Sequence, residues 1–216
     1  MPELVEYSNS LEETIKDSDL QNVTIGLSEI IFDKLIDNGI VKDIPIIGTV
    51  VGLGKATLGI KERLFLKKII YFISELKNIP QDKRRRIVEK IDGSGKFRTK
   101  VGEKLLFIID RCEDHEKVQI IARLFAAFLS QKLSYKEFLR SSFIVERTVL
   151  EDLIWFVNYE YDDFTFEETG DLINSGLFSL ELVDPHDYDR KVPHSFELRV
   201  YLNEIGKKMR DVLKRP

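Results

Sequence analysis

Apolar residues recur three and four positions apart along most of the chain up to Tyr159, and this spacing restricts the fold more than any other feature. Such spacing is typical of helices that bury one face, whereas strands alternate at every second residue. Almost no alternating pattern precedes Tyr159. The pattern predicts helices over residues 23–37, 45–76, 81–91, 98–111, 114–131 and 135–159. We therefore expect a bundle of five to seven helices in this part of the chain.

Several residues mark the expected ends of these helices. Gly39 is a typical stop for the first helix, and Pro45 is tolerated in the first turn of the second. Pro80 ends the second helix and opens the third. Ser134, with Glu137 three residues later, forms a capping box before the last helix. Local chemistry therefore supports the boundaries that the spacing predicts.

The pattern changes in the last quarter of the chain. Thr165 and Glu168 form a second capping box before a short helix, EETGDLINS, which Gly176 ends. The runs LFSLELV and SFELRVYL alternate as strands do, a polar loop with prolines joins them, and NEIGKKMRDVLK predicts a final helix. The expected fold class is mainly α: a helical bundle over residues 1–148, then a small α+β module with one β-hairpin over residues 149–216.

The end of the chain resembles a known family. The run DLINSGLFSLEL followed by FELRVYLNEIGKKM is similar to the back half of a winged-helix domain, over residues 150–214. In that family a leucine-rich helix ends at a Gly-Leu pair, a hairpin forms the wing, and a helix with a Leu-x-x-x-Gly motif follows. The resemblance implies a winged-helix-like shape for this module. Helical proteins of bacteria with such an ending are a further resemblance, which implies no particular activity.

Many winged-helix domains bind DNA, so the charge of the helix expected in the major groove matters. This helix holds Glu167, Glu168 and Asp171 without any Lys or Arg, and residues 150–189 contain 12 acidic and no basic residues. Attraction to phosphates supplies most nonspecific DNA affinity, and a helix of this charge is repelled. We expect the module to bind protein, and we keep a DNA-binding winged-helix regulator as a third hypothesis.

Charge is distributed unevenly along the chain. Residues 1–40 carry a net charge of −7, residues 41–104 carry +9, and residues 105–216 carry −6. The densest basic cluster is Lys83, Arg84, Arg85 and Arg86. This cluster lacks the interleaved aromatic residues that stack on single-stranded bases. We favour pairing of the basic middle with the acidic ends of the same chain, or with a second copy, over a nucleic-acid partner.

The segment DIPIIGTVVGLGKATLGIKERLFLKK, residues 43–68, begins like a membrane helix and ends in charge. Its uncharged run, residues 44–54, has 11 residues, whereas a spanning helix needs about 20. Gly48, Gly52 and Ala56 follow one another four positions apart, and small residues so placed let another helix approach closely. The leading interpretation is a helix that packs tightly inside the protein or against a second copy.

The same segment leaves an alternative open. Val51 and the glycine stripe could contact a membrane if the segment were released, with basic residues on anionic headgroups. Those basic residues are Lys61, Arg63, Lys67 and Lys68. This second hypothesis describes a conditionally membrane-active bacterial defence effector or toxin that uses residues 44–68.

No catalytic or cofactor signature is evident. The run DGSGKFRTK lacks the spacing of a phosphate-binding loop. His186 with His194, and Cys112 with His115, are weak pairs without the spacing of metal ligands or of a catalytic nucleophile. We therefore expect no metal, no cofactor and no enzyme activity.

The compartment is inferred from cysteine usage and from the first residues. Cys112 is the only cysteine, and the run MPELVEYSNSLEE is acidic where a signal peptide is basic and then apolar. We expect a cytoplasmic protein. The leading hypothesis is a non-enzymatic interaction or regulatory protein that binds a protein partner or forms a homo-oligomer. An anionic membrane surface is the partner of the second hypothesis only.

Overall fold

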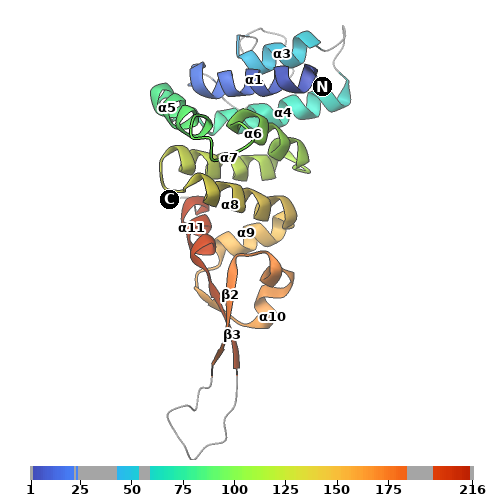
Figure 1. Cartoon of the computed structure of the whole chain (residues 1–216). Helices are drawn as coiled ribbons and strands as arrows, with labels where there is room; N and C mark the ends of the chain where they lie inside the picture. The colour runs from blue at the N-terminus through green and yellow to red at the C-terminus, as the bar shows by residue number, and fades with distance from the viewer. Residues whose placement is uncertain (1, 22, 24–42, 54–58, 184–196, 215–216) are drawn as a thin grey trace, which may run out of the picture. The chain divides into compact units, whose positions relative to one another are not determined.

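The computed structural model of the chain describes residues 2–21, 23, 43–53, 59–183 and 197–214. These residues are mainly helical and include one small antiparallel sheet, which agrees with the expected fold class (Figure 1). The chain divides into two compact units, residues 1–138 and residues 139–216, called the first and the second unit below. The sequence had placed a border between residues 148 and 149.

The helices described in the first unit are α1 (Pro2–Asp17), α3 (Pro45–Leu53), α4 (Ile60–Ser74), α5 (Gln81–Asp92), α6 (Val101–Arg111) and α7 (His115–Leu129). Helix α8 (Tyr135–Arg147) runs from the first unit into the second. The second unit continues with α9 (Leu150–Asn158), β1 (Asp163–Phe164), α10 (Phe166–Thr169), the 3-10 helix η1 (Gly170–Asn174), β2 (Phe178–Val183), β3 (Glu197–Leu202) and α11 (Glu204–Leu213).

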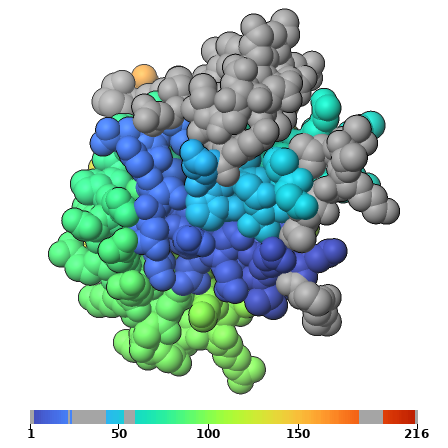
Figure 2. Space-filling model, turned by 90° about the horizontal axis from the view of Figure 1, so that it is seen from above, coloured from blue at the N-terminus to red at the C-terminus, as the bar shows by residue number. Residues whose placement is uncertain are grey.

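Helix α1 was not expected from the sequence, yet it organises the first unit. Leu11 and Ile15 are fully buried, and α1 contacts α3, α5 and α6. Figure 2 shows α1 and α3 side by side at one surface. Gly102 marks the approach of α6 to α1, because a Cβ there would lie 2.7 Å from the Ser8 carbonyl oxygen and 2.7 Å from Glu12 Cβ. A glycine thus allows close helix packing, but this glycine belongs to α6 and not to the stripe expected in residues 48–56.

The prediction of one long helix over residues 45–76 is wrong. Helices α3 and α4 occupy this range, and Gly59 before α4 has an extended backbone, with φ −72° and ψ 171°. Glycine is a weak helix former because its backbone loses the most entropy on folding, so a glycine-rich stretch favours an interruption. Residues 54–58 lie outside the described residues, as does the helix expected over residues 23–37 apart from Val23.

The prediction of a single helix over residues 135–159 is also wrong. Helix α8 ends at Arg147, and Val149 is extended, with φ −61° and ψ 142°. The Thr148 hydroxyl donates to the Ile144 carbonyl at 2.8 Å. Such a bond satisfies the backbone locally and competes with the helix, and two adjacent β-branched residues further favour a break. The described residues up to Asn158 therefore form eight helices, more than the five to seven expected.

The predicted starts of α5 and α8 are confirmed. Helix α5 begins directly after Pro80. At the start of α8 the Ser134 N–H donates to Glu137 Oε2 at 2.7 Å, and the Glu137 N–H donates to Ser134 Oγ at 3.3 Å. Helix α6 begins at Val101, three residues later than expected. Capping chemistry was therefore a better guide to helix starts than spacing alone.

Aromatic rings fill much of the core of the first unit. Phe72 of α4, Phe125 of α7 and Phe138 of α8 are fully buried. The Phe125 ring centroid lies 5.6 Å from that of Phe72 and 5.2 Å from that of Phe138. Tilted rings at such distances attract one another beyond their burial of apolar area. This cluster fixes α4 against α7 and the start of α8.

The second unit contains a three-stranded antiparallel sheet in the order β1-β3-β2. Strands β2 and β3 form the predicted hairpin, with Leu180 opposite Val200 and Leu182 opposite Leu198. The two-residue strand β1 was not predicted, and it places Phe164 opposite Val200. Residues paired across antiparallel strands point to the same side of the sheet. One face of the hairpin is therefore apolar along its length.

Short-range contacts fix the helices around this sheet. The predicted capping box of Thr165 and Glu168 is present at the start of α10. Asn203 caps α11, because its Oδ1 accepts from the Gly206 N–H at 2.9 Å. A Cβ on Gly206 would overlap the carbonyl oxygen of Leu177. Helix α11 therefore packs on the start of the hairpin at a distance that only glycine permits.

Candidate protein-interaction surface

The two described glycines of the stripe, Gly48 and Gly52, belong to α3. Ile46, Ile47 and Val50 of this helix are buried, and the helix contacts α1. The Ile46 N–H donates to the Thr14 hydroxyl of α1 at 3.1 Å. Because a helix turns by about 100° per residue, Gly48 and Gly52 point the other way. Gly48 and Val51 are half-buried, Gly52 is exposed, and Ala56 lies outside the described residues.

The basic residues of α4 are only partly available to a ligand. Lys61 and Arg63 are exposed, and Lys67 and Lys68 are half-buried. The Lys68 ammonium instead donates to the backbone carbonyls of Asp110 and Cys112, at the end of α6. Cations are favoured there, because the last carbonyls of a helix have no partner within it. Lys68 therefore contributes to packing within the first unit.

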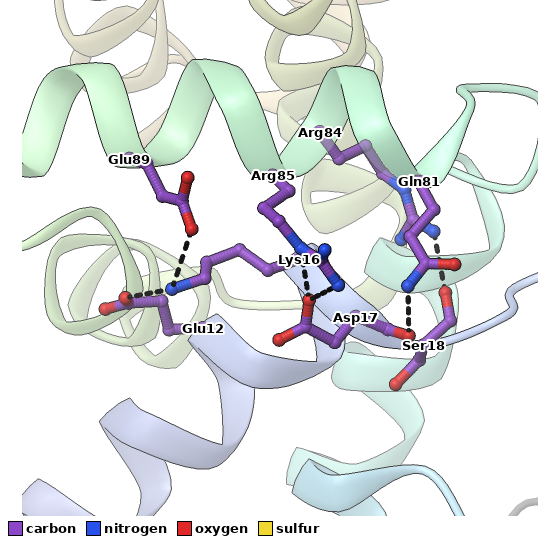
Figure 3. A network of polar contacts seen from close by, with 8 residues as sticks. All are labelled: Glu12, Lys16, Asp17, Ser18, Gln81, Arg84, Arg85 and Glu89. Carbon is purple, nitrogen blue, oxygen red and sulfur yellow. Dashed lines mark hydrogen bonds and ion pairs between the residues drawn. The ribbon is translucent and has the colours of Figure 1, made fainter.

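The basic cluster of α5 divides between solvent and α1 (Figure 3). Arg86 is exposed and Lys83 is half-buried. Arg85 binds Asp17 Oδ1 of α1 through Nη2 at 2.6 Å and through Nε at 2.8 Å. This hydrogen bond raises the pKa of the Arg85 guanidinium above its usual value. Arg85 thus makes an internal pair with the acidic N-terminal part of the chain, of the kind that the charge pattern favours.

Arg84 is the member of the cluster that lies inside the first unit. Its Nη2 donates to the Ser18 carbonyl at 2.6 Å, and burial lowers the pKa of its guanidinium. Beside it, Gln81 Nε2 donates to the Asp17 carbonyl at 2.7 Å, as Figure 3 shows. Side chains at the start of α5 therefore supply donors to carbonyls at the end of α1.

The outer part of the β2–β3 hairpin exposes apolar side chains. Leu180, Leu182 and Leu198 are 53%, 64% and 44% exposed, and the strand register places them on one face. On the same face Val200 and Leu202 are buried. Single exposed leucines are ordinary, but adjacent ones on one face are typical of contact sites. We call Leu180, Leu182 and Leu198 the hairpin apolar face.

Strand β2 also has an edge that pairs with no other strand among the described residues. Such an edge carries unpaired N–H and C=O groups, which can accept a strand from another chain. Its length of six residues, Phe178–Val183, is enough for a regular ladder. The hairpin therefore combines an apolar face with a backbone edge.

Acidic and aromatic residues lie exposed in the segment that precedes the hairpin. Its exposed carboxylates include those of Glu160, Asp163, Glu167 and Asp171. Tyr161 and Phe166 are exposed among them. A cation is attracted by carboxylates and by the faces of aromatic rings. This surface therefore favours a partner with Lys or Arg side chains.

A buried arginine, Arg210, binds this segment through two hydrogen bonds. Arg210 of α11 donates through Nη1 to the Tyr161 carbonyl at 2.6 Å and to Asp162 Oδ1 at 2.9 Å. Its guanidinium lies 5.2 Å from the ring centroid of Phe156 and 5.5 Å from that of Phe164. Burial lowers the pKa of this guanidinium, which the charge of Asp162 opposes. Arg210 thus joins α11 to the turn before β1.

Tyr159 and Glu168 add a second polar link in the same place. The Tyr159 hydroxyl donates to Glu168 Oε1 at 2.9 Å, and its ring stacks on Phe164 with centroids 4.7 Å apart. Hydrogen bonds from the Thr165 backbone N–H and from Tyr159 lower the pKa of Glu168. Glu168 therefore stays ionised, and it serves as both helix cap and acceptor.

A hollow of about 510 Å³ lies within the second unit where α8 gives way to α9. Phe143 and Val149 line it and are exposed. The Arg147 guanidinium lies 5.1 Å from the Phe143 ring centroid, and Asp152 also lines the hollow. The break between the two helices thus exposes further apolar surface beside charged groups.

Two of the four weak catalytic and metal candidates, Cys112 and His115, lie within the described residues. The His115 ring packs on Tyr71 with centroids 4.5 Å apart, and Cys112 is buried. His186 and His194 lie outside the described residues. Among the residues that are described, no three His, Cys, Asp or Glu side chains are grouped so that they could hold a metal ion.

Comparison with protein-family models, with curated proteins and with solved structures finds no match to this chain. Function must therefore be argued from the geometry. In the described ranges, no helix has both the length and the apolar character needed to cross a bilayer.

The hairpin apolar face was not identified as a site from the sequence, although the signal was present. The alternating runs LFSLELV and SFELRVYL predicted the strands, and alternation also assigns each leucine to a side. The register that joins Leu182 to Leu198 was needed to place them together. Burial of Arg84 had a comparable signal, because Ile87 and Val88 follow it by three and four positions on the same side of α5.

Proposed function

We propose that this chain is a non-enzymatic interaction protein, cytoplasmic in location, whose second unit binds a protein through the hairpin apolar face. The observation that carries this proposal is the exposure of Leu180, Leu182 and Leu198 on one side of the hairpin. Burying such side chains in an interface releases about 25 cal/mol for each Å² of apolar area removed from water. Exposed apolar area of this kind is a common mark of contact with another protein.

The charge of the second unit supports a basic partner. Residues 150–189 carry 12 acidic and no basic residues, so a surface with Lys or Arg is attracted and an acidic one is repelled. Residues 41–104 of this chain have a net charge of +9. A second copy therefore offers a surface of the right sign, and a homo-oligomer is the first form of the proposal to test.

The winged-helix resemblance gives this proposal a finer form, with a module over residues 149–216. It is supported by the order of η1, β2, β3 and α11 and by two short motifs. Gly176 and Leu177 precede the hairpin, and Leu202 and Gly206 form the Leu-x-x-x-Gly spacing that follows it. The close packing of Gly206 on the Leu177 carbonyl is a physical reason for both motifs. In this form the hairpin is a wing that contacts protein.

Light scattering of the full chain over a range of concentrations tests the proposal. The test variant replaces the three leucines of the hairpin apolar face by serine. The control variant replaces Glu181 and Arg199 by serine, because these residues pair on the opposite side of the same hairpin. We expect the wild type and the control to self-associate, and the leucine variant to remain monomeric.

If the wild type is monomeric, the same variants are expressed with the neighbouring genes and tested by pull-down. The proposal then requires a protein that the wild type and the control retain and that the leucine variant loses. The proposal would be contradicted if the wild type were monomeric and the wild type, the control and the leucine variant all recovered the same proteins. The two measurements together decide whether the hairpin apolar face is a contact surface.

A membrane-active effector is a second candidate function, and one observation favours it. Ile60 and Leu64, one turn apart at the start of α4, are exposed beside Lys61 and Arg63. Apolar residues beside cations are typical of contact with anionic membranes. This candidate predicts leakage of anionic liposomes by the wild type and its loss in Val51→Asp. Absence of leakage and of toxicity on expression would remove it.

DNA binding by the second unit has no comparable support. The segment from α10 to η1 holds Glu167, Glu168 and Asp171 and no basic residue. The third hypothesis therefore depends on the cluster of α5, where Arg84 is buried and Arg85 binds Asp17. It predicts salt-sensitive binding of duplex DNA that is lost when residues 84–86 are changed to glutamate.

A further inference from the structure

A hollow of about 710 Å³ lies in the first unit between the end of α1 and the start of α5. Charged and polar side chains line it, among them those of Asp19, Lys77, Gln81 and Arg84. Sites for small molecules commonly have volumes of about 300 to 1,000 Å³. The described residues that line the hollow all belong to the first unit, whereas the hairpin apolar face belongs to the second.

The positive charge of Arg84 has no ion-pair partner among the described residues. The side chain is 2% exposed, and only Nη2 has a hydrogen-bond acceptor, the Ser18 carbonyl. Its Nε and Nη1 atoms are buried without any acceptor in the described part of the chain. Asp19 and Asp17 act on the Arg84 pKa through their charges, and Asp17 Oδ1 binds Arg85. Buried charges are normally paired, so an unpaired guanidinium at the wall of the hollow favours an anion.

Two further groups bring positive charge to the same hollow. Helix α5 has 12 residues and begins there after Pro80, which supplies no side-chain acceptor for the amides of the first turn. The N-terminus of a helix attracts anions, because its first N–H groups are unpaired and its dipole is positive at that end. Lys77 lines the hollow, is exposed, and makes no ion pair with the residues described.

We propose that this hollow binds the phosphate group of a small molecule. Lys77 and the backbone amide of Gln81 contact the phosphate oxygens, and Arg84 supplies charge beside them. Asp19 lines the hollow and Asp82 lies in the first turn of α5, and both oppose an anion. Lys77, Arg84 and the helix terminus offset these two charges. The volume exceeds what one phosphate fills, which leaves room for the rest of a phosphorylated molecule.

Thermal unfolding and NMR of the full chain test this site with inorganic phosphate and with glycerol 3-phosphate. We expect both probes to raise Tm above that in chloride of equal ionic strength, because a ligand that binds only the folded state stabilises it. We also expect the amide signals of Gln81 and Asp82 to shift with saturation. A stronger effect of glycerol 3-phosphate identifies a phosphorylated small molecule as the ligand class, and equal effects identify the free ion.

Lys77→Glu is the main variant, because its exposed side chain can change without loss of the fold. We expect at least a tenfold loss of phosphate affinity. Lys90→Glu is the matched control on α5, since Lys90 is exposed and does not line the hollow. Arg84→Met is expected to lose the phosphate effect as well, and Lys77→Glu keeps the test valid if Arg84→Met fails to fold. Equal stabilisation by chloride, or equal losses in Lys77→Glu and Lys90→Glu, would overturn the proposal.

Discussion

Arg84 in the first unit and Arg210 in the second are both buried, at 2% and 3% exposure, but their surroundings differ. Arg210 has a carboxylate partner in Asp162 and lies against the rings of Phe156 and Phe164. Arg84 has one carbonyl acceptor and, within the described residues, no carboxylate within ion-pair distance. Each guanidinium keeps two buried nitrogens without an acceptor in the described residues, so the difference lies in the carboxylate and the rings. Burial lowers the pKa of both guanidinium groups.

This difference separates two uses of a buried cation. A charge that is paired and packed between rings stabilises the fold, because several interactions offset its loss of hydration. A charge without a partner stabilises little by itself, and it keeps attraction for an anion. We therefore assign a structural role to Arg210 and a binding role to Arg84. The predictions below test this assignment, from the largest expected effect to the smallest.

Arg210→Ala is expected to destabilise the second unit by about 3 kcal/mol, because the change leaves a cavity beside Phe156 and Phe164 and removes the link to Asp162. Unfolding in urea, followed by tryptophan fluorescence, measures the loss. The signal reports on this unit, since Trp155 is the only tryptophan and packs on Phe164 with ring centroids 6.0 Å apart.

Lys207→Ala on the same helix is the control for this change. Lys207 is exposed, so its replacement should alter the free energy of unfolding by less than about 0.5 kcal/mol. A loss in Arg210→Ala no larger than that of the control would show that Arg210 does not hold the second unit together.

Gly206→Ala is expected to cost about 2 kcal/mol without any change to Arg210 itself. Its new Cβ would overlap the Leu177 carbonyl oxygen and approach Leu202 Cδ2 at 3.1 Å, so α11 must move and carry Arg210 with it. Unfolding in urea, followed by far-UV circular dichroism, measures this loss, because it reports on helices of both units. Gly52→Ala is the matched change, because a Cβ there meets no described atom within 4 Å, and alanine favours helix by up to about 1 kcal/mol. Equal stability of the two variants would contradict the contact at Gly206.

Much of the local structure could be predicted from the sequence, because it depends on residues near one another in the chain. The capping boxes at Ser134 and Thr165 and the hairpin strands all follow from short-range patterns. The breaks at Gly59 and Thr148 were missed because apolar spacing continues through them. Helix α1 was missed as well, although Leu11 and Ile15 have helical spacing.

The candidate sites were harder to predict, because each depends on residues that are distant in the sequence. The carbonyl of Ser18, directly after α1, and the side chain of Arg84 in α5 are 66 positions apart in the chain. The spacing of Arg84 from Ile87 and Val88 indicates that it lies on the buried side of α5, but no local pattern shows that it binds the Ser18 carbonyl. The glycine stripe shows the converse case, since Gly52 has suitable spacing but is exposed.

Arg84→Met is expected to change the free energy of unfolding by no more than about 1 kcal/mol in a buffer without phosphate. Loss of the hydrogen bond to Ser18 costs about 1 kcal/mol, and removal of an unpaired buried charge offsets much of it. Arg210→Met should cost about 2 kcal/mol, because the ion pair and both ring contacts are lost. Far-UV circular dichroism in urea measures both. Equal losses in the two variants would contradict the assignment of different roles.

The smallest expected effect concerns two carboxyl groups, Asp92 and Glu168, whose pKa values are shifted in opposite directions. Burial raises the pKa of Asp92 at the end of α5, whereas the Thr165 backbone and Tyr159 lower the pKa of Glu168. Asp92 therefore stabilises the fold below its ordinary pKa of 3.8, and this contribution is lost as pH rises through its raised pKa. The contribution of Glu168 is present above its ordinary pKa of 4.5 and is lost as pH falls through its lowered pKa.

Asp92→Asn should thus be more stable than the wild type at pH 7, and Glu168→Gln less stable. The difference for Asp92→Asn should shrink as pH falls through the raised pKa of Asp92. The difference for Glu168→Gln should shrink only below pH 4.5, as pH falls through the lowered pKa of Glu168. Asparagine keeps the acceptor for the Val101 N–H, which donates to Asp92 Oδ1 at 2.9 Å, so the substitution changes mainly the buried charge. Urea unfolding at several pH values measures the two differences. If both substitutions changed the free energy of unfolding in the same direction at pH 7, the opposite roles assigned to the two carboxylates would be contradicted.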